Sequence, residues 1–248
     1  MSTDDSPNRF RNPRNVRILL LSLIVVGVLV LALPLLAILV FLLAMTGFGS
    51  SLLASLNWLF AMNTVQLWWY ITRAAGLVAY LLLWLSTAWG LAVSSKIFDP
   101  LLQRNYTYDF HQFISLLAIG FLVLHISVLL LDHYLPFSVT QLLVPFTSSY
   151  RPLWVGVGVI SLYLTLLVTV TFYMRRIISM RAFRVIHTLS LVAFLGAALH
   201  GLYAGTDSPL VSMQLIYKGS LLSVIFLTAY WLITLLVARY STAKQPSA

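Results

Sequence analysis

The 248-residue chain contains no cysteine. This absence excludes disulfide bonds, thiolate zinc sites, cysteine-held iron–sulfur clusters and cysteine nucleophiles. Charge is also scarce: 8% of the residues are charged, against about 25% in an ordinary soluble domain. Because 60% of the residues are hydrophobic, the chain cannot cover a soluble core with polar surface. Composition therefore excludes a soluble enzyme and a disordered tail, and predicts an integral membrane protein.

Acidic residues are the rarest charged class, with 6 Asp and Glu against 15 Lys and Arg, which gives a formal net charge of +9. An excess of positive charge can indicate nucleic-acid binding. Here the basic residues lie in short clusters between apolar runs, which is how a membrane protein sets its orientation. We therefore expect lipid around the chain and no nucleic-acid partner.

Six apolar stretches are long enough to cross about 30 Å of hydrocarbon as helices. Barrel strands would instead alternate over roughly 10 residues. The sequence predicts an all-α, six-helix transmembrane bundle (18–238) between a basic N-terminal tail (1–17) and a C-terminal tail (239–248). The predicted spans are 18–45, 66–95, 110–131, 153–174, 185–204 and 214–238. The first exceeds the roughly 7–15 apolar residues of a signal peptide, so we interpret it as an uncleaved anchor.

The basic residues predict the orientation. Of the 15 lysines and arginines, 12 lie in the two tails and in the connections 96–109 and 175–184, all on one side of the predicted membrane. Only Arg73, Arg151 and Lys218 lie toward the other side. By the positive-inside rule both termini are cytoplasmic. We expect a multi-pass protein of the cytoplasmic membrane.

Four histidines lie inside the predicted spans, where ionisable groups are costly and usually functional. His111 and His125 are on span 110–131, and His187 and His200 are on span 185–204. The two spans run in the same direction, and the separations of 14 and 13 residues correspond to about 21 and 20 Å of helix. The sequence therefore places one pair, His111 and His187, toward the cytoplasm and the other, His125 and His200, toward the exterior.

Two neutral imidazoles can fill both axial positions of a haem iron. Facing histidine pairs at two depths would therefore hold two haems and carry electrons across the bilayer. A structural hydrogen-bonding role, a proton relay and a haem-free transporter are the alternatives. A relay or a cation transporter usually includes central carboxylates. The aspartates near these spans, Asp109, Asp132 and Asp207, all lie at span ends.

The 13-residue spacing conflicts with a straight helix. Fourteen residues return to within about 40° of the same face, whereas thirteen land about 140° away. His187 and His200 therefore share a face only if the span bends, for example at Gly196 or Gly201, or if the two sites are offset.

The segments FHQFISLLAIGFLVLH (110–125), RVIHTLSLVAFLGAALHG (184–201) and TRAAGLVAYLLL (72–83) resemble the ferric reductase-like transmembrane domain. That family includes ferric reductases, NADPH oxidases and the haem subunit of the bacterial methionine sulfoxide reductase system. The resemblance implies two b-type haems, the cytoplasmic one held by His111 and His187 and the outer one by His125 and His200.

Two features differ from the family pattern. The chain has no dinucleotide-binding fingerprint, so FAD, FMN or a quinol would act only through a partner. Superoxide-producing members often carry a second histidine one turn after the outer ligand, where this chain has Leu129. We therefore expect no direct oxygen reduction as the main activity.

Two arginines are candidate cofactor-binding residues, because haem propionates are anionic. Arg73 lies inside span 66–95, where an isolated charge is expensive unless it meets an anion. We expect it to face the outer haem's propionates or an acceptor, with snorkelling to lipid headgroups as the alternative. Arg184 precedes His187 by one turn and is expected near the inner haem.

These observations predict electron transfer from a cytoplasmic-side flavoprotein or quinol to an extracytoplasmic acceptor, either ferric iron or a partner oxidoreductase. The redox chemistry would belong to the cofactor, so no catalytic side chain is predicted. The alternative is a haem-carrying anchor subunit of a larger redox complex.

Overall fold

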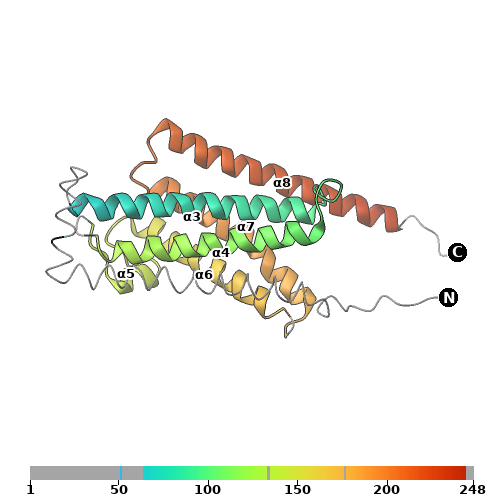
Figure 1. The fold of residues 1–248 in the computed structure, drawn as a ribbon, viewed down its shortest axis with the longest axis horizontal. Helices are drawn as coiled ribbons and strands as arrows, with labels where there is room; N and C mark the ends of the chain where they lie inside the picture. Colours follow the sequence, from blue (N-terminus) through green and yellow to red (C-terminus); the bar gives the residue numbers. More distant parts are fainter. Residues whose placement is uncertain (1–50, 52–63, 133–134, 176, 244–248) are drawn as a thin grey trace.

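The computed structural model describes residues 51, 64–132, 135–175 and 177–243. This part of the chain is helical and contains no strand. Its helices, labelled as in Figure 1, are α3 (Thr64–Ser94), α4 (Arg104–Leu129), α5 (Val139–Leu143), α6 (Pro152–Tyr173), α7 (Met180–Ala204) and α8 (Val211–Ala243).

All of these helices except α5 are long and apolar enough to cross a membrane. The chain is therefore an all-α, multi-pass membrane protein, and five of the predicted spans are confirmed. The predicted first span, 18–45, and the tail before it lie outside the described residues. The short helix α5 was not expected from hydropathy, because five residues are too few to give a periodic signal.

Two helices begin more than one turn before the predicted span. Helix α4 starts at Arg104 rather than at residue 110, and α7 starts at Met180 rather than at residue 185. Hydropathy detects only the part of a helix that is immersed in hydrocarbon. The extra turns carry charged residues, including Asp109 and Arg181, which remain compatible with a helix beyond that depth.

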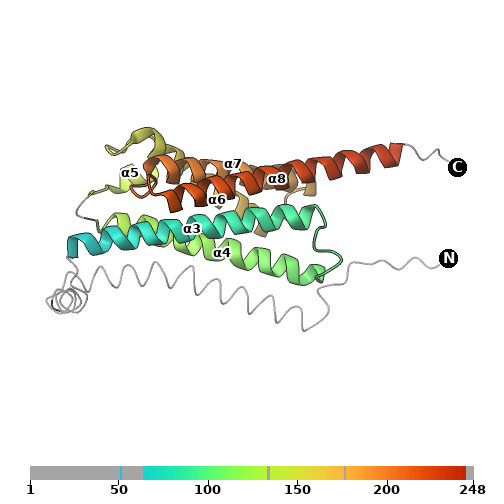
Figure 2. The ribbon, with the colours of Figure 1, turned by 90° about the horizontal axis from the view of Figure 1, so that it is seen from above.

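The long helices form two tightly packed antiparallel hairpins, α3 with α4 and α6 with α7. Figures 1 and 2 show the hairpins side by side, with α8 along α3 and α7. Helices α4 and α7 run in the same direction, as predicted for the two histidine-bearing spans. Small residues allow close approach within the second hairpin: a Cβ on Gly196 of α7 would collide with the Ser161 hydroxyl of α6, a contact typical of membrane helix pairs.

One core cluster joins α3, α7 and α8. It contains Tyr80, Leu91, Phe194, Ala198 and Val224. Phe194 is 1% exposed, and its ring stacks on Tyr80 at a centroid distance of 5.9 Å. The hydroxyl of Tyr80 is hydrogen-bonded to Ser220 of α8. These contacts fix α3 against α7 and α8.

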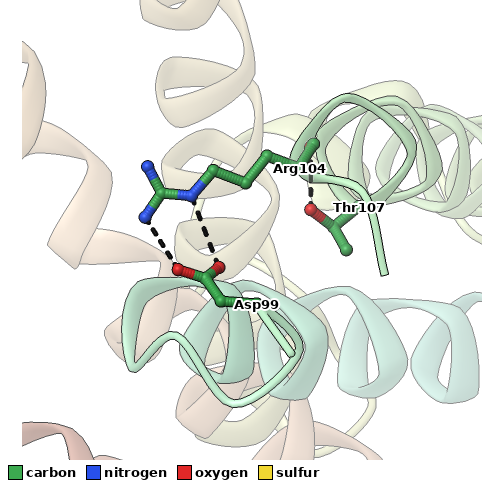
Figure 3. A network of polar contacts seen from close by, with 3 residues as sticks. All are labelled: Asp99, Arg104 and Thr107. Carbon is green, nitrogen blue, oxygen red and sulfur yellow. Dashed lines mark hydrogen bonds and ion pairs between the residues drawn. The ribbon is translucent and has the colours of Figure 1, made fainter. Parts of the chain in front are cut away.

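Polar contacts fix the start of α4 (Figure 3). Arg104 bonds Asp99 through Nη2 and Oδ2 at 3.0 Å and through Nε and Oδ1 at 3.4 Å. Thr107 donates its hydroxyl proton to the Arg104 carbonyl at 2.8 Å. This connection between α3 and α4 sets the register that brings His111 beside α3.

Candidate functional site

The four histidines fall into the two expected groups. His111 of α4 faces His187 of α7, with ring centroids 6.2 Å apart and ring planes at 79°. His125 of α4 and His200 of α7 line one shared cavity. The groups lie at opposite ends of α4 and α7, as their positions along two parallel helices require.

Each group lies in its own cavity between the hairpins. The large cavity, which holds His125 and His200, has a volume of about 440 Å³, within the range of about 300–1,000 Å³ found for small-molecule and cofactor sites. The small cavity, which holds His111 and His187, has a volume of about 110 Å³. Leu83 of α3 and Thr165 of α6 line both cavities. The two spaces are therefore separated by a thin partition.

Glycines on the neighbouring helices make room for three of the imidazole rings. A Cβ added to Gly76 would lie 2.8 Å from Nδ1 of His125, and one added to Gly158 would lie 2.6 Å from Nδ1 of His200. At the other end, a Cβ on Gly90 would lie 3.0 Å from Cε1 of His111. Real Cβ atoms essentially never make contacts shorter than 3.0 Å, and a contact of 3.0 Å is rare. The rings therefore rest directly on the backbone of α3 or α6.

In the large cavity both rings are also fixed by hydrogen bonds. Nδ1 of His125 lies 2.8 Å from the Thr72 carbonyl, and Nδ1 of His200 lies 2.9 Å from the Trp154 carbonyl. A carbonyl only accepts, so each Nδ1 carries the proton and each Nε2 keeps its lone pair. Ligating histidines characteristically use this arrangement, because the bond to the carbonyl orients the ring and raises its basicity.

The two hairpins build this half of the site in the same way. The accepting carbonyl comes four residues before the glycine in both, Thr72 before Gly76 and Trp154 before Gly158. The histidine comes from the second helix of each hairpin. Two different stretches of sequence thus build the same local geometry around one cavity.

The small cavity is built differently. Nδ1 of His111 and Nδ1 of His187 are buried without a hydrogen-bond partner. The His111 ring lies against the backbone at Ser86, four residues before Gly90. Hydroxyl groups make up much of the lining, from Ser86, Thr87, Ser94, Ser115, Thr165, Thr169, Thr188 and Ser190.

The 13-residue spacing on α7 is accommodated because the two rings turn toward different neighbours. His200 rests on Gly158 of α6 and donates to Trp154 of α6. His187 instead faces His111 of α4. An angular offset of about 140° around α7 thus brings both rings into the space between the hairpins, and they need not share a face.

Arg73 lines the large cavity and has an internal partner. Its guanidinium forms an ion pair with Asp207, which follows α7, and lies 3.9 Å from the centroid of the Trp69 ring. Its Nε is buried and has no hydrogen-bond partner. The anion that compensates the charge of Arg73 is therefore the carboxylate of Asp207. The N–H group at Nε of Arg73 remains available to donate a hydrogen bond. Sequence reasoning treated Arg73 as an isolated charge.

Arg184 does not reach the small cavity. Its side chain is exposed, and it is not among the residues that line this cavity. Arg184 lies in the second turn of α7, which begins at Met180, and the cavity lining on this helix begins at His187. The structure therefore does not bring Arg184 together with the inner pair.

The donor set fits an iron porphyrin held by two imidazoles. Neutral imidazoles are suitable ligands for a haem iron, and the ring centroids of His111 and His187 lie 6.2 Å apart. Around His125 and His200, the cavity volume, the glycine contacts and the Nε2 lone pairs fit the same group.

A family model described as Domain of unknown function (DUF8596) matches residues 67–207. The chain belongs to this family. The matched segment contains all four paired histidines, the three glycines that support them and the Arg73–Asp207 pair. No curated protein and no solved structure matches the chain.

Several elements of the site were missed at the level of sequence. They are the three supporting glycines, the Thr72 and Trp154 carbonyls and the carboxylate of Asp207. One signal was present: Gly76 and Gly90 are 14 residues apart, as are His111 and His125. Matching spacings on consecutive antiparallel helices indicate contact at two depths. A carbonyl acceptor leaves no such signal, because every residue has one.

Proposed function

We propose that this chain is a transmembrane di-haem cytochrome b that passes electrons from the cytoplasmic side of the cytoplasmic membrane to an extracytoplasmic acceptor. The observation that carries the proposal is the geometry of the large cavity, where two half-buried imidazoles rest on glycines, donate Nδ1–H to helix carbonyls and line one common space. Iron porphyrin bound between each pair would supply reversible one-electron exchange.

The orientation in this proposal follows from the basic residues. With six spans and cytoplasmic termini, the connections from α3 to α4 and from α6 to α7 face the cytoplasm. His111 and His187 then form the entry site, and His125 and His200 the exit site. The proposed donor is a separate flavoprotein carrying FAD or FMN, or a quinol.

The protein's contribution is to hold the ligands and keep the sites close together. His125 and His200 are oriented by the carbonyls of Thr72 and Trp154, so they need little reorganisation on binding iron. Leu83 and Thr165 form the partition. Arg73, held by Asp207 and with Nε free, is placed to donate to a propionate or to an anionic acceptor at the outer cavity.

The deciding experiment is a reduced-minus-oxidised spectrum of purified protein with haem quantification. We expect about two b-type haems per chain. His125→Ala and His200→Ala should each remove one spectral component, and His111→Ala and His187→Ala the other. His133→Ala is the matched control, because His133 is the fifth histidine of the chain and is not a proposed ligand. Haem content that is unchanged in all four ligand variants would refute the proposal.

A second measurement separates the two roles considered for the chain. Protein reconstituted in vesicles receives a flavin and a reductant, and a ferric chelate is added on the acceptor side. Chelate reduction by the chain alone indicates a ferric reductase. Haems that become reduced and stay so without reducing the chelate indicate an electron-transfer subunit that needs a partner oxidoreductase.

A further inference from the structure

Three of the four histidine rings are held by the backbone of a neighbouring helix, and the fourth is not. His125 and His200 donate Nδ1–H to helix carbonyls and rest on glycines. His111 lies against the backbone at Ser86 and rests on a glycine of α3. His187 has neither kind of support in the described part of the chain. Its Nδ1 is buried without a hydrogen-bond partner, and none of the described glycine contacts involves its ring.

The ring of His187 is held by other rings instead. Phe183, one turn earlier on α7, packs against it with centroids 5.3 Å apart and ring planes at 31°. The other described ring contact is with His111, at 6.2 Å and 79°. Neither contact is a hydrogen bond, so neither fixes the direction in which a nitrogen of His187 points.

The helix around His187 is also less buried than the helices around the other three histidines. Each of those has at least one buried residue within four positions along its own helix. These buried residues are Thr107, Ile114, Val128, Ala198 and Ala204. Residues 183–191 of α7 include no buried residue. Because few buried contacts lower the free energy of local opening, the fold controls the position of His187 least.

These differences bear on how firmly each imidazole would hold iron. A hydrogen bond to a ligating imidazole orients the ring and raises its basicity, and its loss typically weakens metal binding about 10–100-fold. His187 lacks this bond and should therefore leave iron most readily. The hydroxyl oxygens that line the small cavity can accept from the N–H group of the released ring, so this group need not be left in hydrocarbon.

We propose that His187 is the exchangeable axial ligand of the protein, and that the small cavity binds a neutral diatomic molecule, such as CO, in its place. The inference rests on the proposed function, because it requires iron porphyrin at both pairs. In the exchange, the bond between iron and the His187 imidazole breaks, a bond between iron and the carbon of CO forms, and the iron stays ferrous. Because CO binds only ferrous iron, it favours that state and stops the passage of electrons to the large cavity.

The test is a CO difference spectrum of the purified wild-type chain after reduction with dithionite. We expect CO to convert the spectral component that His111→Ala removes and to leave the component that His125→Ala removes. Conversion of the other component, of both to the same extent, or of neither would overturn the inference and leave the di-haem proposal intact. Wild-type protein without haem would refute both proposals.

A second variant tests the inference without removing a ligand. Phe183→Ala removes the ring that packs on His187, so CO at a fixed, subsaturating concentration should convert a larger fraction of the responsive component. Phe110→Ala is the matched control, because Phe110 directly precedes His111 and its ring packs on Trp89, with centroids 4.5 Å apart. It should leave that fraction unchanged. An equal response of both variants, or no response to Phe183→Ala, would contradict the assignment of His187.

Discussion

Gly76 of α3 and His125 of α4 are in direct contact, with the imidazole lying where a side chain at position 76 would begin. A Cβ there would stand 2.8 Å from Nδ1 and 2.9 Å from Cε1 of the ring. The ring cannot withdraw easily, because the same Nδ1 is bonded to the Thr72 carbonyl one turn earlier. One backbone segment of α3 therefore sets both the position and the tautomer of this imidazole.

The first prediction follows from this contact. Gly76→Ala should displace the His125 ring, break its bond to Thr72 and remove one of the two haems from the purified protein. Gly158→Ala should remove the same spectral component, because Gly158 supports His200 in the same way. Haem quantification and the reduced spectrum measure both effects.

Gly219 provides the control for these two variants. A Cβ on Gly219 of α8 meets no atom within 4 Å. Gly219→Ala should therefore leave both haems in place, with helix stability unchanged or raised by up to about 1 kcal/mol. Haem loss from Gly219→Ala equal to that from Gly76→Ala would show that the effect is not local to the imidazole.

The second prediction concerns the other end of the bundle. Gly90→Ala should act on the His111 ring and remove the spectral component that His187→Ala removes, while the Gly76→Ala component persists. The closest approach of a Cβ there is 3.0 Å, so we expect partial rather than complete loss. If Gly90→Ala instead removed the spectral component that Gly76→Ala removes, the assignment of the two components to the two cavities would be wrong.

The third prediction concerns the ion pair of Arg73 and Asp207. Asp207→Asn leaves the guanidinium in the large cavity without its carboxylate. Because the two side chains are 25% and 32% exposed, we expect a loss of about 1–3 kcal/mol in the free energy of unfolding, below the cost of breaking a fully buried pair. Thermal unfolding in detergent, followed by tryptophan fluorescence, measures the change.

Asp99→Asn is the matched variant for this prediction, since it removes the carboxylate of the exposed pair with Arg104. It should change the unfolding temperature by much less, because exposed ion pairs are screened by solvent. Equal effects of the two variants would mean that burial contributes nothing at Asp207.

The fourth prediction tests the orientation and uses the absence of native cysteine. Val139→Cys and Ile177→Cys each introduce a single thiol at a side chain that is 58% and 82% exposed, respectively. A membrane-impermeant maleimide should label position 139 in intact cells and position 177 only after permeabilisation. The reverse pattern would place the large cavity on the cytoplasmic side.

Much of the fold was predictable because a membrane allows few solutions. Runs of apolar residues must become helices, so five described spans and the parallel direction of α4 and α7 followed from hydropathy and order along the chain. Helix starts such as Arg104 and Met180 were not predictable, because hydropathy does not report turns outside the hydrocarbon.

The site was predictable only in part, for a different reason. The pairing of His111 with His187 was predictable, because both residues lie at the same depth on two parallel spans. The partner of Arg73 did not, because Asp207 is 134 positions away along the chain and only the approach of the residues after α7 to α3 brings the two charges together. The rotation of His187 and His200 toward different helices likewise depends on how α7 packs, which a helical wheel does not contain.

Leu83 and Thr165 each touch both cavities, so the chain cannot change the width of one compartment there without reshaping the other. A larger side chain at either position would thicken the wall between the compartments. In the proposed electron-transfer role, these two residues, which are not proposed ligands, would therefore influence how fast electrons pass from one compartment to the other.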